Sequence, residues 1–235
     1  MLKIFKNEIL KFLYGKKLLW LLLCLLGSII FFTILTLNFN KSTLTINDFM
    51  RSYFKGFFLS PILPLILIIF TAQIVAEDYS IGCTKFFLIS KIKKEDIITG
   101  KLAFLILIIL ISLVFSFAAS LLIGAVFFSG LSDLTSIIKL YTICIPALIS
   151  ICGFTAVVAL LCDSFQNTLM ISMGSYIFMT ILDNLLPKAK YFTITYPLSA
   201  GGNVSSVPIV VISLIYLTMF IIFSVRLMKE KDVVL

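Results

Sequence analysis

The sequence predicts an all-α, polytopic membrane protein with six transmembrane helices, and three observations support this fold class. Hydrophobic residues make up 61% of the 235 residues and charged residues only 13%, with a mean hydropathy of +1.18, whereas a soluble domain carries about a quarter charged residues. The apolar residues gather in runs close to the roughly 20 residues that a transmembrane helix needs. The polar segments between these runs are too short and too scattered to form a soluble domain. We therefore expect a single transmembrane domain over residues 1–235.

The first element expected is a basic amphipathic helix over residues 1–17 that lies in the headgroup plane on the cytoplasmic side. Leu2, Phe5, Ile9 and Phe12 recur at three- and four-residue spacing, and lysines fall on the other side. The alternative is a basic flank without a stable helix.

Six spans are predicted at residues 18–37, 57–76, 102–128, 137–161, 168–186 and 207–227. The first is an uncleaved anchor, because no small-residue cleavage site follows it. Residues 38–56 predict a short external loop, with an interfacial helix near residues 49–57 as one option. Pro61 and Pro64 fall in the first turns of the second span, where a missing N–H costs least.

The later connections differ in character. Residues 129–136 predict a tight connection and residues 162–167 a very short inner turn, whereas residues 187–206 predict an external connection rich in aromatic residues, Pro and Gly. Re-entry of this last segment into the membrane stays open. Pro146 and Gly153 are candidate kinks in the fourth span and also suit close helix contacts.

The basic residues predict the orientation. Of the 19 Lys and Arg, 13 fall in segments on the side of the N-terminus, so the positive-inside rule places both termini and residues 77–101 in the cytoplasm. The net charge of +8 is therefore explained by topology rather than by nucleic-acid binding.

Several chemistries are disfavoured by the residues themselves. The chain has no His, and its five Cys form no C-x-x-C pair, so we expect neither a metal site nor a disulfide. Gly100 and Lys101 do not form a phosphate-binding loop, because Glu95 and Leu102 stand where that loop needs Gly and Ser or Thr. No pair of catalytic residues falls at a plausible depth, so we expect no enzyme activity from this chain alone.

Carboxylates inside the spans are nearly absent, which disfavours proton- or ion-coupled transport. Gln73 and Asp183 are the candidate polar residues inside the membrane. We expect Asp183 to reach the outer headgroups rather than to carry an ion.

The densest charged segment runs over residues 77–101. Tyr79, Cys83 and Phe86 recur at helical spacing within it, which suits an amphipathic helix over about residues 79–90 whose aromatic face fits a groove on a soluble partner. A solvated loop that only sets topology is the alternative, and the residues alone leave both readings open.

This segment resembles the hallmark of ABC-2 exporter permeases, in which a Glu ending the second span precedes a run of the form G-T-L-K-x-L-L…P-[VI]-S-R…I…G-K. Here Glu77 precedes G-C-T-K-F-F-L at residues 82–88, and Ile97 and Gly100-Lys101 keep the spacing. The sequence departs from the pattern at Cys83, Thr84, Lys91, Lys93 and Lys94.

The resemblance implies the ABC-2 (type V) exporter fold with an N-terminal elbow helix. It implies a coupling element with contact residues Glu77, Tyr79, Gly82, Lys85, Phe86, Phe87, Lys93 and Lys94. It implies two further partners, namely a dimer of ABC ATPase subunits that binds ATP and Mg²⁺, and a second permease that is either identical or a sister subunit. This chain would bind no cofactor of its own.

The compact chain looks like permeases of the bacterial cytoplasmic membrane that confer immunity or resistance to peptide antibiotics such as lantibiotics and bacitracin. The expected cargo is then an amphipathic antimicrobial peptide or a lipid-like compound. A sodium-efflux type of ABC permease and a membrane immunity or scaffold protein without transport activity are the alternatives.

Overall fold

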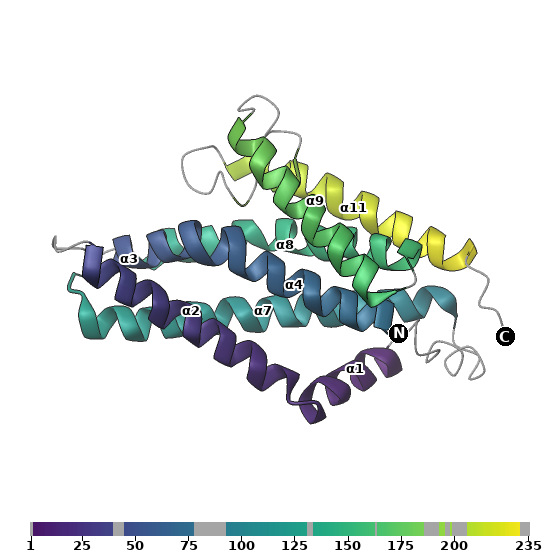
Figure 1. Ribbon diagram of the computed structural model, residues 1–235, viewed down its shortest axis with the longest axis horizontal. Helices are drawn as coiled ribbons and strands as arrows, with labels where there is room; N and C mark the ends of the chain where they lie inside the picture. The colour runs from purple at the N-terminus through teal and green to yellow at the C-terminus, as the bar shows by residue number, and fades with distance from the viewer. Residues whose placement is uncertain are drawn as a thin grey trace.

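The computed structural model of the chain describes residues 2–39, 45–77, 93–130, 134–162, 164–185, 193–195, 198 and 206–230. Nearly all of these residues lie in helices that run along the length of the molecule (Figure 1). Within this described part, six helical stretches are long and apolar enough to cross a membrane. The predictions of an all-α fold and of six such helices are confirmed.

Helix α1 (Leu2–Tyr14) packs against helix α7, and its buried face carries Ile4 and Phe12. The chain then turns at Lys16, which has a φ of 54°, and enters α2 (Lys17–Phe39). The predicted amphipathic helix at the N-terminus is therefore present as a helix. The mainly apolar α2 packs one side against α7 and η1 and exposes the other.

The second membrane-length stretch is continuous and consists of α3 (Ile46–Ser52), the π-helix η1 (Tyr53–Ile62), α4 (Leu63–Ala72) and the π-helix η2 (Gln73–Glu77). The predicted external loop over residues 38–56 is wrong from residue 46 onward. Thr45 caps the helix by accepting a hydrogen bond from the Asp48 N–H. Phe49 and Tyr53 are buried, so one face of this polar-looking segment belongs to the core.

The placement of the two prolines in the first turns of this span is also wrong. Because the helix begins at Ile46, Pro61 lies inside η1 and Pro64 lies within the continuous stretch, at the start of α4. A wider π turn breaks the regular hydrogen-bond ladder, which makes it a place where a residue without an N–H is tolerated. The missing N–H of Pro61 is therefore accommodated within η1 rather than at a helix end.

The remaining long helices are α7 (Lys94–Phe127), α8 (Leu134–Cys162), α9 (Phe165–Leu185) and α11 (Ser206–Glu230). The third span was predicted to begin at residue 102. Instead residues 94–96 form the first turn of α7, where Glu95 and Asp96 are stabilised by the positive end of the helix dipole. The turn predicted over residues 162–167 is shorter than expected, because α8 ends at Cys162 and α9 begins at Phe165.

Helix α8 is the most deeply buried of the long helices and packs against α4, α9 and α11. The contact with α11 is close at Gly153, where an added Cβ would lie 3.0 Å from the Cβ of Phe220. This agrees with the expectation that Gly153 suits close helix packing. Helices α9 and α11 lie on one side of the molecule and α1 and α2 on the other, with α8 between them (Figure 1).

Candidate functional site at the charged end of the bundle

The candidate site is the end of the bundle where η2 finishes and α7 begins, on the right in Figure 1. Glu77 is the last residue of η2, Lys93 is the N-cap residue of α7, and Lys94 opens that helix. Both ends of the predicted coupling segment thus reach the same end of the molecule. The other predicted coupling residues lie outside the described residues: Tyr79, Gly82, Lys85, Phe86 and Phe87.

A buried lysine ties η2 to α7. The side chain of Lys101 is 0% exposed, and its Nζ donates a hydrogen bond of 2.6 Å to the carbonyl oxygen of Ile74. The bond joins residues that lie 27 positions apart, on either side of the predicted coupling helix at about residues 79–90. An ammonium group removed from water is tolerated only where it is paired or hydrogen-bonded, so this contact constrains the two helices strongly.

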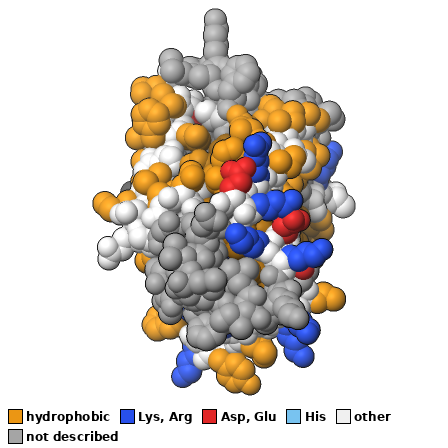
Figure 2. Space-filling view, turned by 90° about the vertical axis from the view of Figure 1, so that its right-hand side faces the viewer, with side chains coloured by type: hydrophobic (Ala, Val, Ile, Leu, Met, Phe, Trp, Pro, Cys, Tyr) orange, Lys and Arg blue, Asp and Glu red, His pale blue; other side chains and the backbone are white. Residues whose placement is uncertain are grey.

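The end of α11 meets the beginning of α7 at the same site. Lys229 Nζ lies 2.9 Å from Glu95 Oε1, and the Lys94 ammonium donates to the backbone oxygen of Lys229 at 3.4 Å. Arg226 and Glu230 form a further ion pair of 3.0 Å within α11. Figure 2 views this end of the molecule and shows basic and acidic side chains close together. These pairs are exposed, so each contributes little to stability.

Helix α1 adds a buried carboxylate to this region. Glu8 is only 4% exposed, and its Oε1 lies 3.3 Å from Lys11 Nζ. Phe12 contacts both Phe70 of α4 and Phe104 of α7, at ring-centroid distances of 5.3 and 5.5 Å. Glu8 precedes Phe12, and Lys101 precedes Phe104, by about one helical turn. A buried acid and a buried base therefore flank one junction of α1, α4 and α7.

Neither Glu8 nor Lys101 was singled out as a site residue from the sequence. The signal was present in the helical spacing, because Glu8 lies three residues after Phe5 and four before Phe12, on the apolar face of α1. Lys101 likewise shares a face of α7 with Phe104 and Leu105. A charge on the apolar face of a helix indicates a buried partner rather than solvent.

The two candidate polar residues of the spans lie in different surroundings. Gln73 is half-buried at the start of η2, close to the charged end. Asp183 lies near the end of α9, and its carboxylate accepts hydrogen bonds from the hydroxyls of Thr193 and Thr195, the former at 2.5 Å. The structure thus gives Asp183 a role in holding residues 193–195 against α9, which sequence reasoning did not expect.

A cluster of hydroxyl groups lies inside the bundle, contributed by α2, η1, α7 and α8. The Tyr53 and Ser28 hydroxyls are 3.0 Å apart. Ser116 and Tyr141 are buried, and within the described residues their hydroxyls have no hydrogen-bond partner. These groups add polarity to the core without adding charge. Among the described residues, no group of His, Cys, Asp or Glu side chains is arranged to hold a metal ion.

The described part of the chain is all-helical, and its long helices are long and apolar enough to cross a membrane. The chain belongs to the family described as protein of unknown function DUF2705, which matches residues 38–234. No curated protein matches the chain.

Proposed function

We propose that this chain is the membrane subunit of an ATP-driven exporter of the ABC-2 type. The observation that carries the proposal is the Lys101–Ile74 bond of 2.6 Å, which ties together the two helices that flank the predicted coupling segment. A segment anchored in this way at both ends is suited to transmit a push from a soluble partner to the spans. The resemblance of residues 77–102 to the permease hallmark points to the same function.

The arrangement suggests how the work would be transmitted. Closure of two ATPase subunits would displace the coupling element between η2 and α7. The Lys101 bond would carry the displacement into η2 and α7 together, whereas the exposed ion pair of Lys229 with Glu95 would break and reform at the end of α11. In this mechanism Lys93 and Lys94 at the start of α7 would pair with acidic groups on the ATPase.

The partners follow from this mechanism. The chain would pair with a second permease, identical or a sister subunit, and with a dimer of ATPases that binds ATP and Mg²⁺. It would lie in the bacterial cytoplasmic membrane, with both termini and the charged end in the cytoplasm and α1 as an interfacial elbow helix. The start of α1 and the end of α11 lie toward the same end of the molecule (Figure 1), which fits an even number of spans.

The cargo that fits best is an amphipathic antimicrobial peptide or a lipid-like compound. Helices α2, α9 and α11 expose apolar faces, and apart from Glu8 and Lys101 near the charged end the buried polar side chains of the described residues are hydroxyls. Such surfaces suit a molecule that is taken from the membrane and returned to its outer side. The activity would then be self-immunity or resistance.

The test is reconstitution of the chain with the ABC ATPase that the proposal requires, followed by measurement of ATP hydrolysis. We expect the two proteins to co-purify and the permease to stimulate hydrolysis. Glu77→Lys and Gly82→Trp should abolish the stimulation while the protein stays inserted, whereas Lys139→Glu, a charge reversal at an exposed position far from the charged end, should leave it unchanged. Equal stimulation by Glu77→Lys and the wild type would refute the coupling assignment.

Two other functions give different outcomes in the same system. A sodium-efflux permease would show stimulation that depends on sodium and not on membrane-active peptides. An immunity or scaffold protein would protect cells without any ATPase. Susceptibility of cells to a panel of such peptides, with and without the ATPase gene, separates these cases.

A further inference from the structure

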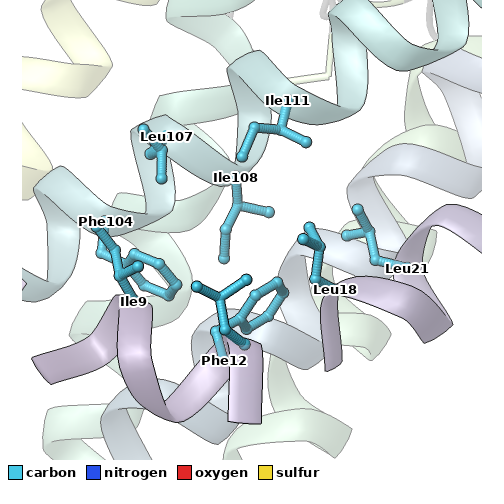
Figure 3. A pocket seen from close by; sticks show the side chains of 9 residues that line it. Ile9, Phe12, Leu18, Leu21, Phe104, Leu107, Ile108 and Ile111 are labelled. Atoms are coloured by element: carbon cyan, nitrogen blue, oxygen red, sulfur yellow. The ribbon is translucent and has the colours of Figure 1, made fainter. Parts of the chain in front are cut away.

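A cavity lies in the crease where α1 turns into α2, against the side of α7 (Figure 3). Its walls consist only of apolar side chains: Ile9, Phe12, Leu13, Leu18, Leu21, Phe104, Leu107, Ile108 and Ile111. Phe12, Leu21, Phe104 and Ile108 are buried at its base, whereas Leu13 is 52% exposed at its mouth. The cavity therefore opens sideways, toward the surroundings of the helices.

Basic side chains surround the corner that closes one end of this cavity. The corner is a tight turn, in which the N–H of Gly15 donates to Lys11 and the N–H of Lys16 donates to Leu13. Lys16 is exposed and Lys17 is half-buried. Within the described residues neither of them forms an ion pair, whereas Lys11 lies 3.3 Å from Glu8.

An occupant must match both features. Purely apolar walls disfavour water, because a water molecule needs two or more polar partners. A hydrocarbon chain needs no polar partners and gains van der Waals contacts with the apolar walls. The two lysines at the corner attract a phosphate, and basic residues at a membrane surface favour anionic lipids.

We propose that this cavity binds one acyl chain of an anionic phospholipid, with the phosphate of its headgroup beside Lys16 and Lys17. The inference depends on insertion of the chain in a membrane and not on exporter activity. The lipid would join α1, α2 and α7 at the turn and hold α1 at the depth of the headgroups. It would be a bound component of the protein rather than one of many exchanging neighbours.

The test is native mass spectrometry of the purified full-length chain in a mild detergent, with phosphatidylglycerol or phosphatidylcholine added. We expect one phosphatidylglycerol to stay bound, in clear preference to phosphatidylcholine. Leu107→Trp fills the cavity and should reduce the bound fraction severalfold. Leu110→Trp is the matched control, because Leu110 is exposed on the same helix and does not line the cavity; it should bind as the wild type does.

The headgroup contact is tested by Lys16→Gln combined with Lys17→Gln, substitutions that leave the cavity intact. Removal of the two ammonium groups should weaken phosphatidylglycerol binding about thirtyfold, at about 1 kcal/mol for each lysine near an anionic surface. Lys139→Gln, at an exposed position on α8, should have no effect. Thermal unfolding of each variant shows whether it is folded.

Three outcomes would overturn the proposal. Equal retention of both lipids would mean that the headgroup is not recognised. Equal binding by Leu107→Trp and Leu110→Trp would mean that the lipid covers the surface without entering the cavity. Unchanged binding after removal of both lysines would place the phosphate elsewhere. Loss of ATPase stimulation alone would bear on the exporter function and leave this inference intact.

Discussion

Replacement of Lys101 by Met tests the contact on which the candidate site depends. Met has a similar length and removes the ammonium group, so the Ile74 carbonyl oxygen loses the donor that lies 2.6 Å away. Hydrogen bonds to charged groups contribute about 1.5–3 kcal/mol, and a buried acceptor left without a partner costs a similar amount. We therefore expect a loss of about 2 kcal/mol in the free energy of unfolding. For a chain of this size that corresponds to a fall in Tm of about 4–8 °C.

The assay is thermal unfolding of the purified protein in detergent, followed by circular dichroism. Lys94→Met is the matched control, because the bond from Lys94 is exposed and 3.4 Å long; surface substitutions of this kind change stability by less than about 0.5 kcal/mol. A Tm of Lys101→Met equal to that of the wild type would refute the reasoning. A higher Tm would show that desolvation of the buried ammonium costs more than its hydrogen bond returns.

Three further predictions concern contacts elsewhere in the fold, each measured by the same unfolding assay. Gly153→Ala should destabilise the protein by about 1–3 kcal/mol, since its Cβ would meet α11 at 3.0 Å, whereas Gly174→Ala, with no atom within 4 Å of its Cβ, should be neutral or stabilising; equal effects would contradict the close packing. A double-mutant cycle with Glu95→Gln and Lys229→Met should give a coupling energy of about 0.2–1 kcal/mol that falls with salt, and a larger, salt-independent value would mean the pair is not solvent-exposed. Asp183→Asn replaces one of the two carboxylate oxygens that accept from Thr193 and Thr195. This should lower the free energy of unfolding by at least about 1.5 kcal/mol, and an unchanged Tm would show that these bonds do not stabilise the fold.

The existence of the six long helices could be predicted because hydropathy depends on composition alone. The starts of the second and third of these helices could not, and the reason is the same for both. Asp48 and Arg51 look like loop residues, as do Lys94 and Glu95, yet each pair lies in a helix whose opposite face is buried. Averaged hydropathy registers the polar side chains and ignores the face of the helix on which they lie.

The sequence draws attention to the charged segment but not to the buried contact beside it. Residues 77–101 stood out by their charge, and the structure brings both ends of that segment together. The contact that joins them could not be predicted, because the partner of Lys101 is a backbone oxygen 27 residues away. That oxygen belongs to the π-helix η2, and no local pattern in the sequence predicts a π turn there.

The contacts of α7 at the charged end differ in strength. The bond from Lys101 is buried, so η2 and α7 should move as one unit when the segment between them is displaced. The ion pair of Lys229 with Glu95 is about half exposed on both sides, so it should yield under the same displacement. Helix α11 instead packs closely on α8 through Gly153. If the segment between η2 and α7 is displaced as proposed, we therefore expect the exposed ion pair between α7 and α11 to be the contact that breaks and reforms.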